Sequence, residues 1–490
     1  MRATRIARIK EYTMARLEHD IAALTALLGP TQVISDPSQL IWYRLDGLRP
    51  SRGYRDRQRL GVTPRCVVRP RSTAEVQALV QWANAQQVAL VPYGGGTGLM
   101  GGAMADGESV LIDFRDMARI LAIRRDDRQA VVQSGVVLGT LEEALRAEGL
   151  TLGHDPWTLG IAMVGGAIST DGMGYRGGQY GSMGEQVLGL EVVLPQGEIL
   201  RTRAVPKSST GPDLTQLFIG AEGVFGIITE ATLHVFPAPE ARVLLAVAFP
   251  AFAQGLAAVQ EMAAVGLRPA LLELDEDYPA PMAGSRATVD EAHTTLYLGC
   301  EGFQELVAAQ RARALAICLR HGGKDLGETT AREFWEERHR IAERFQQDRF
   351  RNLPRGILDS RPEASFDYIH VALPASLVLT YRERALALCR ARDLTVTQCG
   401  IWTRPELFSM ALHNPSGDRE ILADTIDALL TFVQDMGGSM EYCHGVGVRL
   451  AHLLPRELGV GVHLLRGLKR MLDPNSVLNP GKLALGPEVS

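Results

Sequence analysis

The 490-residue sequence contains no uninterrupted apolar run near the roughly 20 residues that a transmembrane helix needs. Its six cysteines include no C-x-x-C pair, which argues against a redox or zinc motif and indicates reduced thiols. The formal net charge of -5 argues against nucleic acid as a main partner. The N-terminus is basic but lacks the apolar core of a secretory signal. Together these absences predict a cytoplasmic protein without a transmembrane segment.

The chain is too long for one ordinary domain, and its 46% hydrophobic content supplies material for more than one core. Glycine becomes rarer and long helical patterns begin after the prolines at 237 and 239. A new glycine cluster begins near residue 439. We therefore predict an N-terminal helix within 1–30, a first domain over 31–240, a second over 241–438, and a C-terminal segment over 439–490 that returns to the first domain.

The most informative stretch is residues 91–102, which hold six glycines in twelve positions directly after an apolar run. Dense glycine allows positive φ and exposes successive N–H groups, which together bind anions such as phosphate. Gly96–Gly101 also satisfies G-x-G-x-x-G, but the dinucleotide-binding fingerprint requires a helix immediately afterwards. The chain instead continues into a strand-like run at Val110–Phe114. The sequence therefore predicts a pyrophosphate held by loop amides between two strands.

Periodicity and capping signals place regular elements on both sides of this loop. Ser72-Thr-Ala-Glu75 is a capping box that begins a helix, and this helix joins two strands into a βαβ unit. An amphipathic helix is predicted over 14–29, and Thr140 is predicted to cap another helix. Longer helices are predicted in the second half, over 303–321, 330–345, 377–391 and 419–436.

Three further motifs follow the glycine loop in a fixed order. They are Asp155–Thr158 with the glycine-rich run 165–174, the segment 213–229, and the terminal Asn479-Pro-Gly-Lys482. This order resembles the FAD-binding family of the p-cresol methylhydroxylase and vanillyl-alcohol oxidase type. Within that family the chain is most similar to D-2-hydroxyacid dehydrogenases (D-lactate, glycolate) and to alkyl-dihydroxyacetone-phosphate synthase.

The resemblance implies an α+β fold, with a two-subdomain FAD-binding module of the p-cresol methylhydroxylase type. An α+β cap domain with an antiparallel sheet would cover the flavin ring. By position in the motifs, the pyrophosphate cradle would be Pro92, Gly94, Gly95, Gly96, Thr97, Gly98 and Leu99. The opposite wall would be Asp155, Thr158, Gly165, Gly166, Ser169 and Gly172, and the ribose and adenine would meet Glu222, Gly226 and Ile228.

The glycine loop also bears on how FAD is held. Some relatives tether FAD through a histidine in this loop, whereas the matching neighbourhood here contains Thr97 and no histidine. We therefore expect non-covalent FAD.

The catalytic candidate is the run Glu441–Gly447. The dehydrogenases of the family carry Glu-His-Gly-Ile-Gly, in which the histidine is taken as the base and the glutamate as a metal ligand. His444 matches this histidine, but Cys443 stands in place of the glutamate. The second metal motif of that group is also missing, so we expect no metal. The synthase branch has a His-Gly-Val-Gly run without a metal, and the present chain matches it only in part.

Less specific interpretations of these residues remain open. His444 could fix a loop instead of reacting, and Tyr442 could contact the substrate or only pack. Arg404, beside Trp402, could clamp a carboxylate or phosphate, although exposed arginines are common. The tryptophan and arginine within 335–338 are interpreted as an ordinary amphipathic helix face.

The sequence thus predicts an FAD-dependent oxidoreductase that oxidises an alcohol or a 2-hydroxy acid by hydride transfer to flavin N5. His444 would be the base, assisted by Tyr442 and Arg404. The alternatives are synthase-like chemistry through a flavin N5 adduct, or a flavin-binding protein without turnover. A homodimer is expected, and the sequence leaves the electron acceptor unknown.

Overall fold

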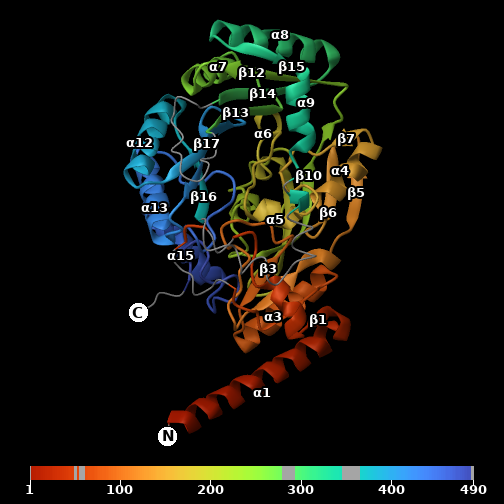
Figure 1. The fold of residues 1–490 in the computed structure, drawn as a ribbon. Helices are drawn as coiled ribbons and strands as arrows, with labels where there is room; N and C mark the ends of the chain where they lie inside the picture. Colours follow the sequence, from red (N-terminus) through yellow and green to blue (C-terminus); the bar gives the residue numbers. More distant parts are fainter. Residues whose placement is uncertain are drawn as a thin grey trace.

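The computed structural model describes residues 2–48, 52–54, 61–278, 293–340, 342–344 and 365–486, and it describes side chains from residue 15 onwards. Two smaller sheets and their helices form the half of the molecule that contains the N-terminus (Figure 1). A large sheet with its own helices forms the opposite half. The predicted α+β class, with an antiparallel cap sheet, is confirmed.

The first sheet has four strands in the order β1-β2-β4-β3. Its strands are β1 (Val33–Ile34), β2 (Cys66–Val68), β3 (Leu90–Tyr93) and β4 (Val110–Asp113). Both β2 and β3 run parallel to β4, which lies between them, so the predicted βαβ unit is present but its two strands are not neighbours. The glycine loop leads from β3 directly into β4 without a helix, as predicted.

The helices around this sheet form largely for the predicted reasons. α3 (Thr73–Gln86) begins at Ser72, whose hydroxyl accepts a hydrogen bond from the Glu75 N–H at 3.3 Å. α1 (Arg2–Leu28) starts earlier than predicted, and it buries Leu24 and Leu28. The predicted cap at Thr140 is wrong, because α4 (Leu138–Ala147) already begins at Leu138 without a side-chain cap.

The second sheet is antiparallel with five strands in the order β5-β6-β10-β8-β9. Its strands are β5 (Ile120–Arg124), β6 (Gln129–Gln133), β8 (Val187–Val193), β9 (Ile199–Arg201) and β10 (Ile227–His234). Two further short strands, β7 (Leu150–Thr151) and β11 (Phe236–Pro237), form a separate antiparallel pair. The short helices α5 (Val164–Ser169) and α6 (Gly177–Tyr180) follow the Asp155 motif.

The third sheet has seven antiparallel strands in the order β15-β12-β14-β13-β17-β18-β16, and we call it the cap sheet. Its strands are β12 (Ala241–Phe249), β13 (Leu271–Asp277), β14 (His293–Gly302), β15 (Lys324–Gly327), β16 (Ser365–Ala372), β17 (Thr395–Trp402) and β18 (Leu407–Asn414). The helices that contact it include α7 (Phe252–Ala264), α8 (Gln304–Arg320), α12 (Val378–Ala391) and α13 (Arg419–Asp435). These helices lie along the outer side of the sheet (Figure 1).

The two faces of the cap sheet differ in composition because side chains alternate along each strand. Ile369, Val371 and Met410 point to the outer face and are almost fully buried in one core with the helices. Tyr368 and His370, on the inner face, are only partly buried. We call this side, which faces the rest of the molecule, the inner face. α9 (Glu328–Glu337) covers its β12 end.

The last part of the chain returns to the first sheet. After α14 (Leu454–Leu458) and α15 (Gly461–Leu472), Leu478 forms a parallel bridge with Leu90 at the start of β3. The Asn479 N–H then donates to the Leu90 carbonyl at 2.8 Å. The C-terminal segment therefore packs beside the strand that leads into the glycine loop. The domain boundaries near 240 and 438 stay predictions.

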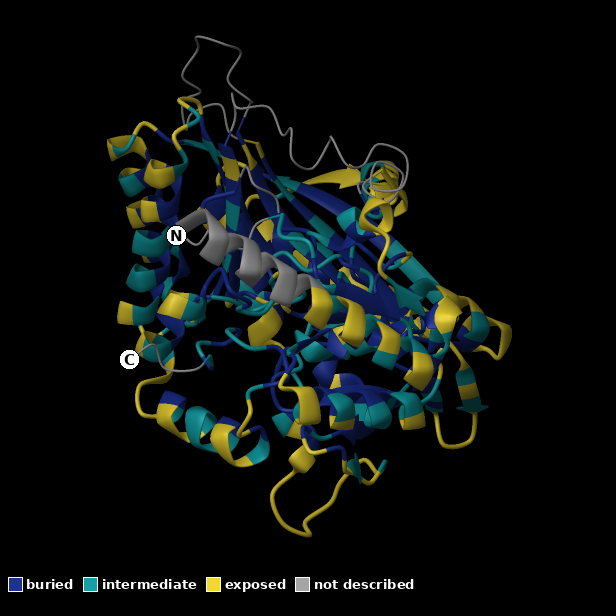
Figure 2. Ribbon diagram, turned by 90° about the horizontal axis from the view of Figure 1, so that it is seen from below, coloured by how far each residue is buried: buried dark blue, intermediate teal, exposed yellow. Residues whose placement is uncertain are grey.

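Two general properties bear on the sequence-based expectations. No helix in the described ranges is long and apolar enough to cross a membrane. All six cysteines have free thiols, and only Cys443 is not fully buried. Buried residues concentrate between the helices and the sheets, whereas the outward sides of the helices are exposed (Figure 2).

A buried ion network joins the cap sheet to the segment that follows the Asp155 motif. Glu301, on β14, accepts hydrogen bonds from Arg176 Nε, Tyr180 Oη and Arg242 Nε, each at 2.8 Å. Burial alone would raise the pKa of Glu301, but Arg176 and Arg242 outweigh it and hold that pKa below its ordinary value. The network therefore stabilises the folded chain only while Glu301 is ionised.

We predict that Glu301→Gln lowers the free energy of unfolding by about 3 kcal/mol at pH 7, because the buried Arg176 and the partly buried Arg242 lose their charged partner. The folded pKa is lowered, so this contribution is complete above the unfolded pKa of about 4.3 and is lost as the pH falls through the folded pKa. Denaturant unfolding of the wild type and the variant, at pH 7 and below pH 4, measures this contribution. The exposed Glu305→Gln is the control, and an equal effect of both variants contradicts the prediction.

Candidate active site

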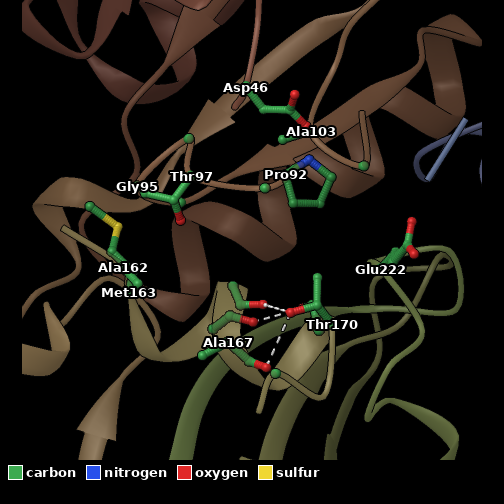
Figure 3. A pocket seen from close by; sticks show the side chains of 18 of the residues that line it. Asp46, Pro92, Gly95, Thr97, Ala103, Ala162, Met163, Ala167, Thr170 and Glu222 are labelled. Atoms are coloured by element: carbon green, nitrogen blue, oxygen red, sulfur yellow. Dashed lines mark hydrogen bonds between the residues drawn. The ribbon is translucent and has the colours of Figure 1, made fainter. Parts of the chain in front are cut away.

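One cavity lies where the glycine loop faces segments from the second sheet and the C-terminal segment. Its lining includes residues of 92–103, 154–173 and 222–228, together with Cys443 and His444. In Figure 3, Asp46, Pro92 and Thr97 face Ala167, Thr170 and Glu222 across this space. Thr170 is held by its own short helix, because its hydroxyl donates to the carbonyls of Gly166 and Ala167 at 3.2 and 3.4 Å.

The cavity brings together nearly all of the predicted cofactor residues. Those that line it are Pro92, Gly94, Gly95, Gly96, Thr97, Gly98, Leu99, Thr158, Gly165, Gly166, Ser169, Gly172, Glu222, Gly226 and Ile228. These positions come from three separate segments of the sequence, 92–99, 158–172 and 222–228. The contacts that each would make with FAD stay predictions.

Asp155 is the exception, because its side chain does not line the cavity. Its carboxylate lies 2.9 Å from Arg338 Nε and 2.8 Å from His339 Nε2. Burial would raise the pKa of Asp155, but His339 and Arg338 lower it to about 2. Trp335 lies on the buried face of the amphipathic α9, as the sequence predicts, and Arg338 in addition stacks 3.7 Å above its ring. Asp155 therefore links its loop to the end of α9.

The cavity walls suit an extended dinucleotide such as FAD. A Cβ built on Gly166 would meet no atom within 4 Å, so this glycine leaves open space beside the backbone. The N–H groups of Thr97, Gly98 and Leu99 make no hydrogen bond within the part of the chain that the structure describes. These donors remain available for phosphate oxygens, as the glycine loop predicts.

Other glycines are required for close packing behind the cavity. A Cβ on Gly95 would lie 2.3 Å from the Ile161 carbonyl oxygen, and one on Gly165 would lie 2.7 Å from Ser134 Cβ. The glycine loop and the start of α5 therefore approach backbone to backbone. This contact sets the separation of the two cavity walls.

Glu222 connects the cavity to the turn that carries His444. Its carboxylate accepts the N–H groups of Val446 at 2.6 Å and Gly447 at 2.9 Å. Burial raises the pKa of Glu222 to about 7, although the Gly447 and Val446 N–H groups act in the opposite direction. Gly445 and Gly447 have φ of +79° and +55°, so the turn adopts a backbone conformation that favours glycine.

The terminal motif braces the same region. Asn479 Nδ2 donates to the carbonyls of Gly102 at 2.9 Å and Glu222 at 2.7 Å. Lys482 Nζ donates to the Met104 carbonyl at 2.9 Å. The motif therefore ties the end of the glycine loop to Glu222.

His444 lines the cavity and has a carboxylate on its other side. Its Nδ1 lies 3.3 Å from Glu441 Oε1, and the side chains are 13% and 5% exposed. The same oxygen accepts the N–H groups of Tyr442, Cys443 and His444 at 2.8 to 3.1 Å. Burial lowers the pKa of His444, but Cys443 and Glu441 outweigh it and raise that pKa well above the usual range. Glu441 thus lies on the Nδ1 side of the ring, and Nδ1 forms no hydrogen bond within the described residues.

A second histidine, which the sequence analysis did not single out, lies against His444. The rings of His370 and His444 are 4.5 Å apart between centroids and nearly perpendicular. Burial, followed by the charges of His444, Arg52 and Arg449, lowers the pKa of His370 well below its usual value. His370 is therefore neutral beside His444. The sequence gives no signal for this role, because it does not show that His370 and Tyr368 on β16 point toward His444.

The other two catalytic candidates have different positions. Tyr442 is not among the cavity-lining residues; its ring lies between His370 and Trp402, with centroid distances of 5.5 and 6.4 Å. Burial, first, and then Cys443 and Glu441 raise its pKa well above 10, so its phenol is a poor base. Arg404 is not brought to the cavity: its side chain is 44% exposed and its nearest ionic partner is Glu185 at 3.5 Å.

Several cavity residues were missed or given a lesser role. Asp46, Ser134 and Met163 line the cavity, and no pattern in their neighbourhoods marks them. His154 also lines it, and burial lowers its pKa to about 4, so it is neutral there. Asp46 is placed by a tertiary contact, since the adjacent Gly47 N–H donates to the Gly98 carbonyl at 2.6 Å and a Cβ there would clash with the loop.

Within the described ranges, no three histidine, cysteine or acidic side chains are grouped so that they could hold a metal ion. Cys443, at the position of the ligand glutamate in the dehydrogenases, has its sulfur 3.8 Å from the Met173 carbonyl oxygen. The expectation that no metal is needed stays a prediction.

Comparisons with known proteins agree with this architecture. The family model of the FAD binding domain matches residues 64–203, and that of the FAD linked oxidases, C-terminal domain, matches residues 238–483. D-2-hydroxyglutarate dehydrogenase of Xanthomonas citri pv. viticola is 31% identical over 481 residues, covering 94% of this chain and 96% of the relative. The probable mitochondrial D-lactate dehydrogenase of Danio rerio is 29% identical over 432 residues, covering 86% and 84%.

Solved structures show the same fold at lower identity. p-Cresol methylhydroxylase with substrate bound has a TM-score of 0.75 at 19% identity, covering 96% of this chain and 97% of its own. Alkyldihydroxyacetonephosphate synthase has a TM-score of 0.74 at 21% identity, covering 94% and 84%. The matched motifs, the cavity and both family models lead to one conclusion. The chain belongs to the FAD-linked oxidase family with the FAD-binding domain of the p-cresol methylhydroxylase type.

Proposed function

We propose that this protein oxidises the CH–OH group of a small alcohol or 2-hydroxy acid, with non-covalent FAD as the oxidant and His444 as the base. The observation that carries the proposal is the pair His444–Glu441 at the wall of the cavity. The names of the relatives, D-2-hydroxyglutarate and D-lactate dehydrogenases, support a hydroxylated substrate. Compartment and oligomer, predicted as cytoplasm and homodimer, belong to the same proposal.

The chain's residues divide the work between holding the cofactor and moving a proton. FAD, when bound, supplies a ring that accepts a hydride, and the protein supplies position and electrostatics. The Thr97–Leu99 amides would hold the pyrophosphate, with Gly166 leaving room beside the opposite wall. His444 would take the substrate hydroxyl proton at Nε2, because its Nδ1 edge faces Glu441.

The pKa of His444 sets the condition for this step. A base must be neutral when it accepts the proton, whereas Glu441 favours the protonated ring. Flavin reduction should therefore become faster as the pH rises and His444 loses its proton. Glu441 in turn stabilises the imidazolium that forms when the substrate proton arrives.

Synthase-like chemistry and a flavin binder without turnover are the alternatives. Anaerobic mixing with a panel of alcohols and hydroxy acids separates them from the proposal, since only a substrate that is oxidised bleaches the flavin band for as long as oxygen is excluded. No bleaching by any member of a broad panel would count against the oxidase proposal.

We predict that His444→Ala slows flavin reduction by roughly 10²-fold or more while FAD stays bound, which is the usual effect of losing an acid–base group. Tyr442→Phe should cost less, because its buried phenol keeps its proton. Stopped-flow reduction under anaerobic conditions measures both rates. Reduction of His444→Ala at the wild-type rate would place the base elsewhere.

The dependence on pH gives a second, independent prediction. Glu441→Gln removes the negative charge that raises the pKa of His444, so the rising limb of the reduction rate should move to lower pH. Rates measured from pH 5 to 10 in both proteins check the direction. A limb that moves upward, or does not move, contradicts the assigned pair.

We predict that the protein is yellow and that acid or heat denaturation releases free FAD. The reason is Thr97, at the position where tethering relatives carry histidine. Precipitation of the polypeptide followed by an absorption spectrum of the supernatant tests this expectation. Flavin that stays with the denatured chain would show a covalent link.

Activity should also survive removal of divalent metals. Dialysis against EDTA is expected to leave the rate of flavin reduction unchanged, since Cys443 replaces the ligand glutamate and the described residues offer no metal cluster. Loss of activity that zinc or manganese restores would overturn the expectation.

A further inference from the structure

An acidic pair lies on the inner face of the cap sheet, away from the FAD cavity. Glu273 and Asp275 are two residues apart on β13 and therefore point to the same face. Their partners on β17 are Trp402 and Gly400, and on β14 they are Tyr297 and Thr295. Neither carboxyl is used by the mechanism described above.

The pair has no cation to balance it. Asp275 is 6% exposed, and neither carboxyl forms an ion pair with any described residue. Burial raises the pKa of Asp275 well above its ordinary value, and the charges of Glu273 and Asp277 raise it further. Burial, followed by Asp277, raises the pKa of Glu273 to about 8. Two uncompensated buried carboxyls are costly, so a folding role does not explain them.

A continuous row of side chains connects this pair to His444. Glu273 is opposite Trp402, and the Trp402 and Tyr442 rings are 6.4 Å apart. Tyr442 is 5.5 Å from the His370 ring, which is 4.5 Å from His444. The row therefore runs across the inner face from the candidate base to the acidic pair.

The middle of this face, between the two ends of the row, has small side chains. Gly400, Ser409 and Ala411 are neighbours across β17 and β18. A Cβ on Gly400 would lie 3.1 Å from Ser409 Oγ and 3.2 Å from Asp275 Oδ1. Asp275 and Ser409 therefore direct oxygen atoms toward the same space above Gly400.

Polar atoms along the row lack partners. Glu273 Oε2, Trp402 Nε1 and Tyr442 Oη are buried and form no hydrogen bond within the described structure. A buried polar group that stays unsatisfied destabilises the folded chain. Three of them in one row, beside the unpaired Asp275, indicate a place where a ligand completes the hydrogen bonding.

We propose that Glu273, Asp275, Trp402 and Tyr442 bind the end of the substrate remote from the reacting carbon, and that this end carries hydroxyl or ammonium donors and no carboxylate. The inference rests on the proposed function, because it assumes that a substrate is oxidised beside His444. Carboxyl oxygens accept hydrogen bonds from such donors, whereas a carboxylate placed there would meet like charge or require protons to be retained.

The proposal separates this chain from relatives named for acidic substrates. Arg404, the candidate clamp for a carboxylate, points to solvent near Glu185. Arg338 is engaged by Asp155, and Arg52 and Arg449 share the carboxylate of Asp367. The acidic pair on β13 is thus the strongest charged feature that the inner face offers to a substrate.

Four probes test the proposal on the FAD-loaded protein. Besides the hydroxyl group to be oxidised, xylitol carries further neutral hydroxyl donors, 1-amino-2-propanol carries an ammonium donor, and D-2-hydroxyglutarate carries two carboxylates. 1-Propanol carries no polar group besides that hydroxyl. Dissociation constants from calorimetry measure binding, and anaerobic flavin bleaching measures oxidation. The first two probes distinguish a hydroxyl from an ammonium ligand.

Glu273→Gln and Asp275→Asn are expected to weaken the better donor probe by about tenfold, since each amide replaces one carboxyl oxygen with an NH2 group that cannot accept a hydrogen bond. Glu305→Gln is the control, because it removes one carboxylate at an exposed position of α8, away from the pair. It should change the dissociation constant by less than twofold. Circular dichroism confirms that each variant is folded.

The outcomes separate this inference from the proposed function. Tighter binding of D-2-hydroxyglutarate than of both donor probes overturns the inference, as does unchanged binding in Glu273→Gln and Asp275→Asn or no binding of either donor probe. Bleaching by D-2-hydroxyglutarate alone would still support the oxidase. Donor binding that the two variants weaken, without bleaching by any alcohol, would support the subsite and count against the oxidase.

Discussion

The buried carboxylate of Glu222 is the contact on which the candidate site depends. It accepts the N–H groups of Val446 and Gly447, and Asn479 holds its backbone carbonyl against Gly102. The turn that carries His444 is thereby fixed to the glycine loop, although hundreds of residues separate them in the sequence. Because a carboxylate can accept several N–H donors at once, the Glu222 side chain holds the turn at Val446 and Gly447. The Asn479 amide then joins the Glu222 backbone to the glycine loop.

The protonation of each titratable side chain around the site depends on the charged groups buried beside it. Glu441 lies beside His444 and favours its protonated form, whereas His370, surrounded by cations, stays neutral. Similar burial thus has opposite net results for two adjacent histidines, because their neighbours differ in charge. On the inner face, Glu273 and Asp275 have only acidic neighbours and aromatic rings. The site therefore combines a carboxylate-assisted base with a region that accepts hydrogen bonds.

Local patterns predicted the parts of the fold that depend on local forces. The capping box at Ser72 and the absence of a helix after the glycine loop depend on only a few neighbouring residues, and both predictions are confirmed. The predicted cap at Thr140 is wrong because α4 already begins at Leu138, with Val137 at the N-cap position. The capping-type sequence therefore lies inside the helix. Asp155 was assigned to the cofactor wall, but its carboxylate is taken by Arg338 and His339 from a segment almost two hundred residues away.

The sequence by itself determined the family, the order of the motifs and the residues that leave room for a dinucleotide, because glycine acts through its own backbone freedom and missing side chain. Tertiary structure decided what the charged and aromatic residues do. Arg404 reaches the surface, His370 reaches His444, and Glu273 lies opposite Trp402, since strand pairing and the packing of the cap sheet set these positions. A side chain's chemistry is local, but its partners depend on contacts between distant segments.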